Sequence, residues 1–135
     1  MDKTITLLMG IHCHQPVGNF GWIFEEAYEK SYKPFLDVLE KHPKIKIALH
    51  YSGCLLDWFM EKKPEFIVRL KKLVNQSQIE LMTAGYYEPI IPIIPKDDAI
   101  GQVAMLTDFL KKRLSYDPKG LWLTERVWEK GLIKF

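Results

Sequence analysis

A carboxylate flanked by two indoles stands near the end of the sequence. The stretch 120–129 contains Glu125 between Trp122 and Trp128, and it follows a turn signal at 117–120. Carboxylates act as nucleophiles and as acids or bases in glycoside cleavage, and indoles stack on sugar rings. The types and spacing of these residues therefore predict a sugar-cleaving site in which Glu125 takes part.

Other polar residues follow apolar runs earlier in the chain. His12 and His14 follow one run, His50 closes a second, and Glu88 follows a third. In an extended chain, residues i and i+2 point to the same side, so His12 and His14 can meet one ligand. They could donate to sugar hydroxyls, or they could be the first two ligands of a metal site. His50 is interpreted as a structural histidine.

The elements that must position these residues alternate between strand and helix. Continuous apolar runs indicate strands that are buried on both faces, and we expect them at Ile5–Ile11, Lys46–Tyr51, Gln78–Ala84 and Leu121–Thr124. Helical spacing between them predicts an α/β fold with four parallel strands and helices packed outside. Ligands bind at the carboxyl ends of parallel strands, which is where His12, His14, Glu88 and Glu125 stand.

Prolines and charges mark the expected helices. Pro34 should split or kink the helix over 24–41, and Pro64 should open another. The loop 86–95 has three prolines, which exclude a helix and a central strand, so we expect an apolar wall there. A last helix, carrying its apolar face over 100–114, has acidic residues at its start and basic residues at its end. Because successive strand residues face opposite sides, Glu125 and Arg126 should not pair.

Bulk composition excludes several classes of function. The 135 residues include 47% apolar and 27% charged residues, with 19 Lys+Arg against 17 Asp+Glu and a net charge of +2. This balance gives no reason to expect a nucleic acid or a membrane surface as partner. Two cysteines are too few for a disulfide framework, and no run reaches the length of a membrane span. We expect a soluble, cytoplasmic protein without a cofactor, and the lysine and glutamate content hints at a thermophile.

Three segments carry a resemblance to a known family. They are His14-Gln15-Pro16, Gly85-Tyr86-Tyr87-Glu88-Pro89-Ile90 and Trp122-Leu123-Thr124-Glu125-Arg126-Val127-Trp128-Glu129. In order and spacing they resemble the first three conserved regions of glycoside hydrolase family 57, and most closely its archaeal 4-α-glucanotransferases and α-amylases. The resemblance implies a seven-stranded (β/α) barrel that acts on α-1,4-glucans with retention. It also implies that Glu125 is the nucleophile.

The same resemblance assigns the sugar-binding residues. It implies that His12, His14, Glu88 and Trp122 line the glucose subsite around the cleaved bond. Trp22 and Tyr87 are expected to stack on the glucan or maltooligosaccharide. Glu129 is expected to be exposed to solvent.

The sequence departs from the family in its extent. The family's acid/base is an aspartate in a fourth region, and a barrel of this class needs about 250 residues. Residues 1–135 are therefore expected to form the N-terminal half of a barrel, truncated after the fourth strand. The open edge would favour self-association or a complementing chain. Lys130-Gly131 also stands where the family has a Pro-Glu pair.

Two other functions remain open from the sequence. The first is a metal-dependent deacetylase or amidohydrolase on a similar barrel, with zinc bound through His12 and His14. The second is a catalytically inert chain that binds glucan weakly or needs a partner. The missing acid/base favours the second for the isolated chain.

Overall fold

The computed structural model describes residue 3 and residues 5–134. In this part of the chain, three strands form one sheet: β1 (Gly10–Cys13), β2 (Ile47–Tyr51) and β3 (Ile79–Leu81). The α-helices are α1 (Gly21–Ala27), α2 (Lys33–Lys41), α3 (Gly53–Lys62), α4 (Pro64–Asn75) and α5 (Lys96–Leu114). Shorter turns are the π-helical η1 (Tyr28–Tyr32) and the 3-10 turns η2 (Ile91–Ile93), η3 (Thr124–Arg126) and η4 (Lys130–Lys134).

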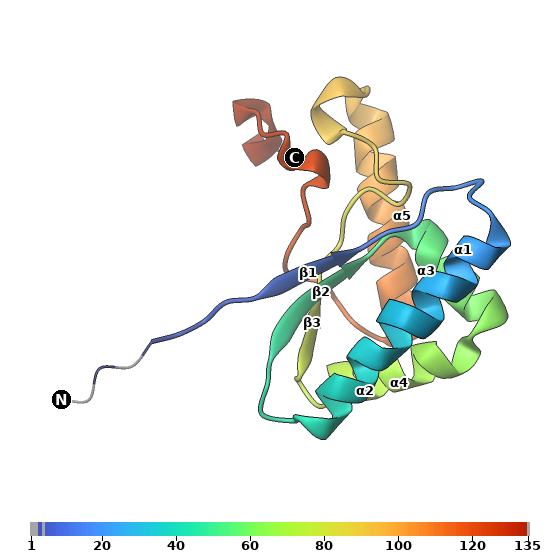
Figure 1. Cartoon of the computed structure of the whole chain (residues 1–135). Coiled ribbons are helices and arrows are strands. Elements are labelled where there is room, and N and C mark those ends of the chain that lie inside the picture. Colours follow the sequence, from blue (N-terminus) through green and yellow to red (C-terminus); the bar gives the residue numbers. More distant parts are fainter. Residues whose placement is uncertain (1–2, 4, 135) are drawn as a thin grey trace.

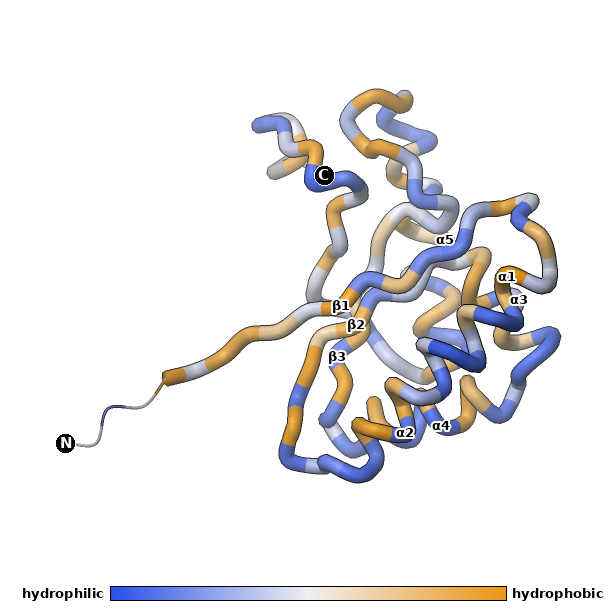
Figure 2. Tube along the Cα trace, viewed as in Figure 1, coloured by the Kyte–Doolittle hydropathy of each residue, from blue (hydrophilic) through white to orange (hydrophobic). Residues whose placement is uncertain are grey.

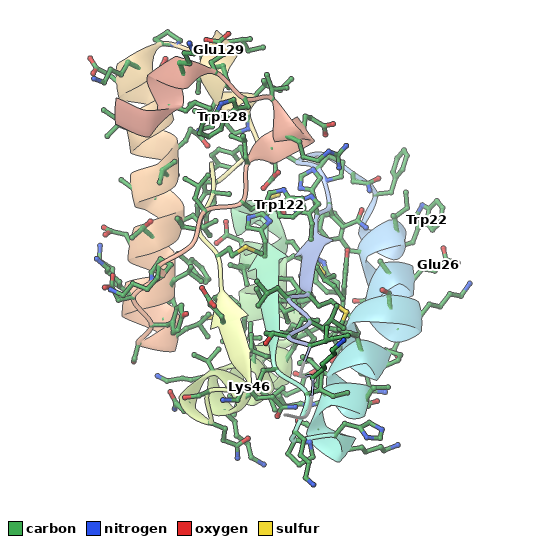
Figure 3. The ribbon with its side chains drawn as sticks, turned by 90° about the vertical axis from the view of Figure 1, so that its left-hand side faces the viewer. Trp22, Glu26, Lys46, Trp122, Trp128 and Glu129 are labelled. Carbon is green, nitrogen blue, oxygen red and sulfur yellow. The ribbon has the colours of Figure 1, made fainter. Side chains whose placement is uncertain are left out.

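The strands are parallel and follow one another in the order β1-β2-β3. The helices lie on one side of this sheet in Figure 1, and they lie behind and beside it in Figure 3. The predicted α/β class with parallel strands and outer helices is confirmed. This arrangement brings the carboxyl ends of the strands to one edge of the sheet.

The sheet has three described strands where four were predicted. The segment expected as the fourth strand contributes a single parallel bridge between Thr83 and Leu121. Two hydrogen bonds hold it: the Thr83 N–H donates to the Gly120 carbonyl at 2.9 Å, and the Trp122 N–H donates to the Thr83 carbonyl at 2.7 Å. At Thr124 the backbone leaves the extended conformation and enters η3. The prediction of a full strand was wrong because a tight turn follows the bridge almost at once.

The first strand is also shorter than predicted. It begins at Gly10, where β2 becomes available as a partner, and residues 5–9 are extended without being part of a described strand. Ile5, Leu7 and Leu8 are 95%, 78% and 89% exposed. Figure 2 shows this projecting segment as a hydrophobic arm outside the sheet. Among the described residues, no helix is long and apolar enough to cross a membrane.

The long helix through residues 21–41 widens at a proline rather than breaking. Pro34 lies in the first turn of α2, and η1 stands directly before it. Proline cannot donate to the preceding turn, and its ring crowds the carbonyl four residues back, so a π-helical turn relieves both problems. The predicted interruption is therefore a change of helix type. Its inward residues Tyr28 and Tyr32 are buried in the core.

The other helix signals behave as expected. Pro64 opens α4, and α5 carries Asp97 and Asp98 in its first turn and Lys111, Lys112 and Arg113 in its last. The loop before α5 contains one 3-10 turn, η2, in which Ile91 is buried and Ile93 is 73% exposed. The loop is thus packed on one side only.

Two glycines fix the position of the loop that follows β3. A side chain at Gly53 would lie 2.4 Å from the ring of Tyr86, and the Gly53 N–H donates to the Tyr86 carbonyl at 2.9 Å. A side chain at Gly85 would lie 2.6 Å from Cδ of Pro89. The loop 85–89 therefore packs closely against the start of α3, and this packing fixes the position of Glu88.

Candidate functional site

The imidazoles at the ends of β1 and β2 form a hydrogen-bonded pair. His12 and His50 stand opposite each other in the strand register, and their Nδ1 atoms are 2.8 Å apart. His50 is fully buried, whereas the side chain of His12 is 30% exposed. His14 follows two residues later, with its ring centre 6.1 Å from that of His12. The three rings meet at the carboxyl edge of the sheet, as the strand pattern predicted.

Glu88 reaches the same point from the loop after β3. The backbone of Glu88 is left-handed, with a φ of 58°. Residues other than glycine rarely adopt this conformation outside constrained turns. Its Oε1 lies 3.3 Å from His50 Nε2, and its Oε2 lies 4.0 Å from His12 Nε2. The hydroxyl of Thr124 donates to Oε2 at 3.1 Å. The carboxyl is 7% exposed, so it faces the histidines rather than solvent.

Burial decides the charge state of this cluster. It raises the pKa of Glu88 to about 7, with a further increase from the charge of Glu125, against the lowering effect of the Thr124 hydrogen bond. It lowers the pKa of His50 to about 3, helped by His12 and His14. The pKa values of His12 and His14 are also lowered, chiefly by burial. At neutral pH the site therefore holds neutral imidazoles beside a carboxyl that is close to its titration point.

The indole of Trp122 lies parallel to the histidine pair. Its ring centre is 4.7 Å from that of His12 at an interplanar angle of 3°, and 6.1 Å from that of His50 at 9°. The bridge between Thr83 and Leu121 places it there, directly after the chain joins the sheet. Figure 3 shows Trp122 at the upper end of the strands.

Glu125 stands on a strained turn at the same edge. Its φ is 54°, and that of Arg126 is 58°, so both residues are left-handed within η3. No ion pair joins Glu125 and Arg126 among the described residues, as predicted, but the reason given was wrong because the strand ends before them. Glu125 is exposed, and its charge acts on the pKa values of Glu88, His12 and His14. Glu88 and Glu125 thus both have a left-handed backbone, which Ser77 and Ser115 also adopt.

The remaining predicted residues, Trp22, Tyr87 and Glu129, are exposed. Trp22 is 64% exposed at the start of α1, where it stacks on Phe20 with ring centres 6.4 Å apart, and Figure 3 shows it well to the side of Trp122. Tyr87 is 49% exposed and contacts Tyr86 edge-on. Glu129 is exposed, as expected.

His50 and Thr124 are the members of the cluster that sequence reasoning undervalued. His50 is buried, as its interpretation as a structural histidine implies. That interpretation did not foresee its hydrogen bond to His12 or its contact with Glu88. The available signal was the register: a histidine at the carboxyl end of the neighbouring strand must stand beside the first one. For Thr124, the sequence carries no signal for a contact with Glu88, since the turn was not foreseen.

Three of these side chains could in principle approach one cation. One ligand atom each from His12, His50 and Glu88 lies within 4.8 Å of the others. This set differs from the pair His12 and His14 that the sequence suggested. The Nδ1 atoms of His12 and His50 are already bonded to each other, so a metal ion would have to displace that hydrogen bond.

Comparison with known proteins points to one family. The sequence profile of glycosyl hydrolase family 57 matches residues 8–135. An α-amylase of Pyrococcus abyssi is 53% identical over 130 residues, which is 96% of this chain and 20% of the amylase. A 4-alpha-glucanotransferase of Thermococcus litoralis is 51% identical over 132 residues, 98% of this chain and 20% of the relative.

The solved structures agree with the sequences. The crystal structure of the Thermococcus litoralis 4-alpha-glucanotransferase superposes with a TM-score of 0.91 over 94% of this chain and 20% of that chain. An α-amylase of Thermotoga maritima superposes with a TM-score of 0.76 at 16% identity, covering 94% of this chain and 36% of that one, which bears on the fold alone. The chain thus spans 20% of the length of these two curated relatives.

Proposed function

The chain belongs to glycosyl hydrolase family 57, and from this premise we propose that it carries the nucleophile and part of the sugar-binding site of an enzyme that acts on α-1,4-glucans with retention. One observation carries the proposal. Polar and aromatic groups from the ends of β1 and β2, from the loop after β3 and from the segment after the Thr83–Leu121 bridge meet at one point, with the charge of Glu125 beside them. They are His12, His50, Glu88 and Trp122.

Glu125 is the proposed nucleophile. A retaining mechanism needs a carboxylate that attacks the anomeric carbon and forms a glycosyl-enzyme intermediate. Glu125 is exposed on a sharp turn, so a sugar can reach it, and the constrained backbone limits the directions in which it can point. Its charge already acts on His12 and His14, the other proposed sugar contacts.

Glu88 is proposed to bind sugar and support the histidines rather than to transfer a proton to the leaving group. Its raised pKa of about 7 would suit a general acid. However, its carboxyl is 7% exposed, receives the Thr124 hydroxyl and faces His50. A leaving oxygen would have to displace these neighbours. The family resemblance implies instead that the acid/base is an aspartate in the family's fourth conserved region.

The sugar would lie against Trp122 and His12. An indole face covers the apolar side of a sugar ring, and a partly exposed imidazole can bond to its hydroxyls. His14 is proposed as a second hydroxyl contact, and its buried Nδ1 has no hydrogen-bond partner among the described residues. Trp22 and Tyr87 would contact more distant glucose units of a maltooligosaccharide.

Hydrolysis and transfer share the same first step. Water resolves the glycosyl-enzyme in a hydrolase, and a sugar hydroxyl resolves it in a transferase. Relatives named as α-amylases and as a 4-alpha-glucanotransferase are similarly close to this chain. We therefore propose the shared step for this chain and leave the acceptor open.

A chimera tests the proposal. Residues 1–135 replace the matching segment of the Thermococcus litoralis 4-alpha-glucanotransferase, and transfer between maltooligosaccharides is measured. Glu125→Gln should abolish transfer, whereas Glu129→Gln, an exposed neighbour, should leave it near the parent level. Wild-type turnover in the Glu125→Gln chimera would refute the assignment of the nucleophile.

The free edge of β1 is the proposed contact for a complementing segment. Among the described residues β1 pairs only with β2, and the apolar arm 5–9 continues from it with its side chains exposed. An open, apolar edge pairs readily with another strand.

Sedimentation of the isolated chain should show self-association; a monomer at all concentrations would contradict this part of the proposal.

A further inference from the structure

The two peptide groups on either side of His14 are each held by another segment of the chain. The carbonyl of Cys13 accepts from the Ser52 N–H at 3.1 Å, and the carbonyl of His14 accepts from the Tyr32 hydroxyl at 3.4 Å. Because β1 ends at Cys13, strand pairing does not reach the second of these groups. The planes of the two peptide groups set the φ and ψ of His14, and these angles set the direction of its side chain.

We propose that Tyr32 is a positioning residue whose hydroxyl holds the His14 carbonyl and so directs the His14 ring to the sugar site. The His14 ring centre lies 6.1 Å from that of His12, with the planes 17° apart. Its buried Nδ1 has no hydrogen-bond partner among the described residues, so this atom does not fix the ring and the backbone must do so. The inference rests on the sugar-binding role proposed above for His14.

A chain of hydrogen bonds sets the direction of the bond from Tyr32. The Phe20 N–H donates to Asn19 Oδ1 at 2.9 Å, so Asn19 presents its Nδ2 to Gln15 Oε1, 2.9 Å away. Gln15 Nε2 therefore faces the Tyr32 oxygen and donates to it at 3.3 Å. The Tyr32 oxygen accepts this hydrogen and gives its own to the His14 carbonyl. A backbone donor at one end and a backbone acceptor at the other fix the polarity of the whole chain.

The ring of Tyr32 is held independently of these bonds. It is buried and packs edge-on against Tyr51 and Phe59, with ring centres 6.4 Å and 5.5 Å away. Tyr32 is the last residue of η1, and π-helical turns are frequent at functional sites. Burial raises the pKa of Tyr32, so the hydroxyl keeps its hydrogen at neutral pH and can donate. The core thus fixes the place from which the hydroxyl acts.

Cys54 gives the loop after β1 a second anchor. Its thiol, in the first turn of α3, donates to the Gln15 carbonyl at 2.9 Å. This bond holds the peptide group after Gln15 without the help of Tyr32. Loss of the Tyr32 hydroxyl should therefore turn the peptide group after His14 and leave the rest of the loop in place.

The test reads the carbonyl and the ring of His14 by NMR in the 135-residue chain without sugar. The carbonyl carbon resonance depends on the hydrogen bond, and the nuclear Overhauser effect between the rings of His12 and His14 depends on their separation. Tyr32→Phe keeps the ring in the core and removes only the hydroxyl. It should shift the His14 carbonyl resonance upfield and change the Overhauser effect. If both stay as in the wild type, the proposal is overturned.

Tyr28→Phe is the matched control. Tyr28 lies in the same turn, η1, is also buried, and donates its hydroxyl to Glu65 at 3.1 Å. This variant also loses one hydroxyl and one hydrogen bond, so its stability in urea should fall by a similar amount. The carbonyl resonance and the ring contact of His14 should not change. Changes of equal size in both variants would show that Tyr32 only stabilises the fold.

Gln15→Glu tests the direction of the chain while Tyr32 is still present. A carboxylate accepts from Asn19 as the amide does, but it cannot donate to Tyr32. The Tyr32 hydroxyl then donates to the carboxylate, and the His14 carbonyl loses its partner. Gln15→Glu should therefore shift the His14 carbonyl resonance in the same direction as Tyr32→Phe. A resonance that remains at the wild-type position would overturn the assigned direction.

Maltohexaose binding separates this proposal from the proposed function. Loss of the Tyr32 hydrogen bond, which is long, should weaken binding by about 2- to 5-fold, and Tyr28→Phe should bind like the wild type. If Tyr32→Phe moves His14 but the wild-type chain binds no maltohexaose, the sugar-binding role fails and the positioning role stands. If the wild-type chain binds maltohexaose and Tyr32→Phe binds it equally well, the positioning role fails.

Discussion

Thr124→Val should raise the pKa of Glu88. The Thr124 hydroxyl donates to Glu88 Oε2 at 3.1 Å, and this bond favours the ionised carboxylate. Valine has nearly the same shape but no donor, and Thr124 is 4% exposed, so water cannot easily replace the hydroxyl. A hydrogen bond to a charged group contributes about 1.5–3 kcal/mol, and one pKa unit corresponds to about 1.4 kcal/mol. The pKa of Glu88 should therefore rise by about one to two units from its value of about 7.

Carbon NMR of the Glu88 carboxyl during a pH titration measures this change. Thr107→Val provides the control, because its hydroxyl is 2.8 Å from that of Thr83 and belongs to a different contact. The control should leave the pKa of Glu88 unchanged. A Glu88 pKa that stays constant or falls in Thr124→Val would refute the view that the Thr124 hydroxyl stabilises the ionised form.

Three further predictions concern stability. Gly53→Ala should cost about 1–3 kcal/mol in the free energy of unfolding by urea, because the new methyl would lie 2.4 Å from the buried ring of Tyr86; an unchanged midpoint would contradict the packing described. Gly101→Ala, which meets nothing within 4 Å in α5, should instead add about 0.5–1 kcal/mol, and a loss would show that the helix needs this glycine. Because the pKa of His50 falls from 6.5 to about 3 on folding, protons bind the unfolded chain more strongly, and stability from this group is lost as the pH falls from 6.5 towards 3. His50→Asn should reduce this acid sensitivity, and equal slopes of unfolding free energy against pH in both proteins would count against it.

The sequence predicts the parallel sheet and the edge where the site lies. Buried apolar runs show where the strands are, and polar residues directly after them collect at one edge because the strands are parallel. His12 and Glu88 meet in the structure for this reason. The signals for α4 and α5 were equally local: a proline in the first turn, and charges that match the helix dipole.

Tertiary contacts explain what the sequence did not predict. The turn at Glu125 and Arg126 depends on two left-handed residues, and neither is a glycine that would mark it. Ile5 is exposed because the apolar arm 5–9 has no described strand beside it. The apolar composition of a segment does not tell whether a neighbouring strand covers it. The link between His12 and His50 depends on strand register, which needs the pairing of β1 with β2.

Covalent labelling of Glu125 tests the central claim most directly. In the chimera, a fluorinated α-glucosyl fluoride supplies a leaving group that departs without protonation, so the step depends on the nucleophile rather than on the acid. Mass spectrometry of peptides should find one glycosyl group on Glu125, and none after Glu125→Gln. A glycosyl group on Glu88, or labelling that persists in Glu125→Gln, would contradict the account.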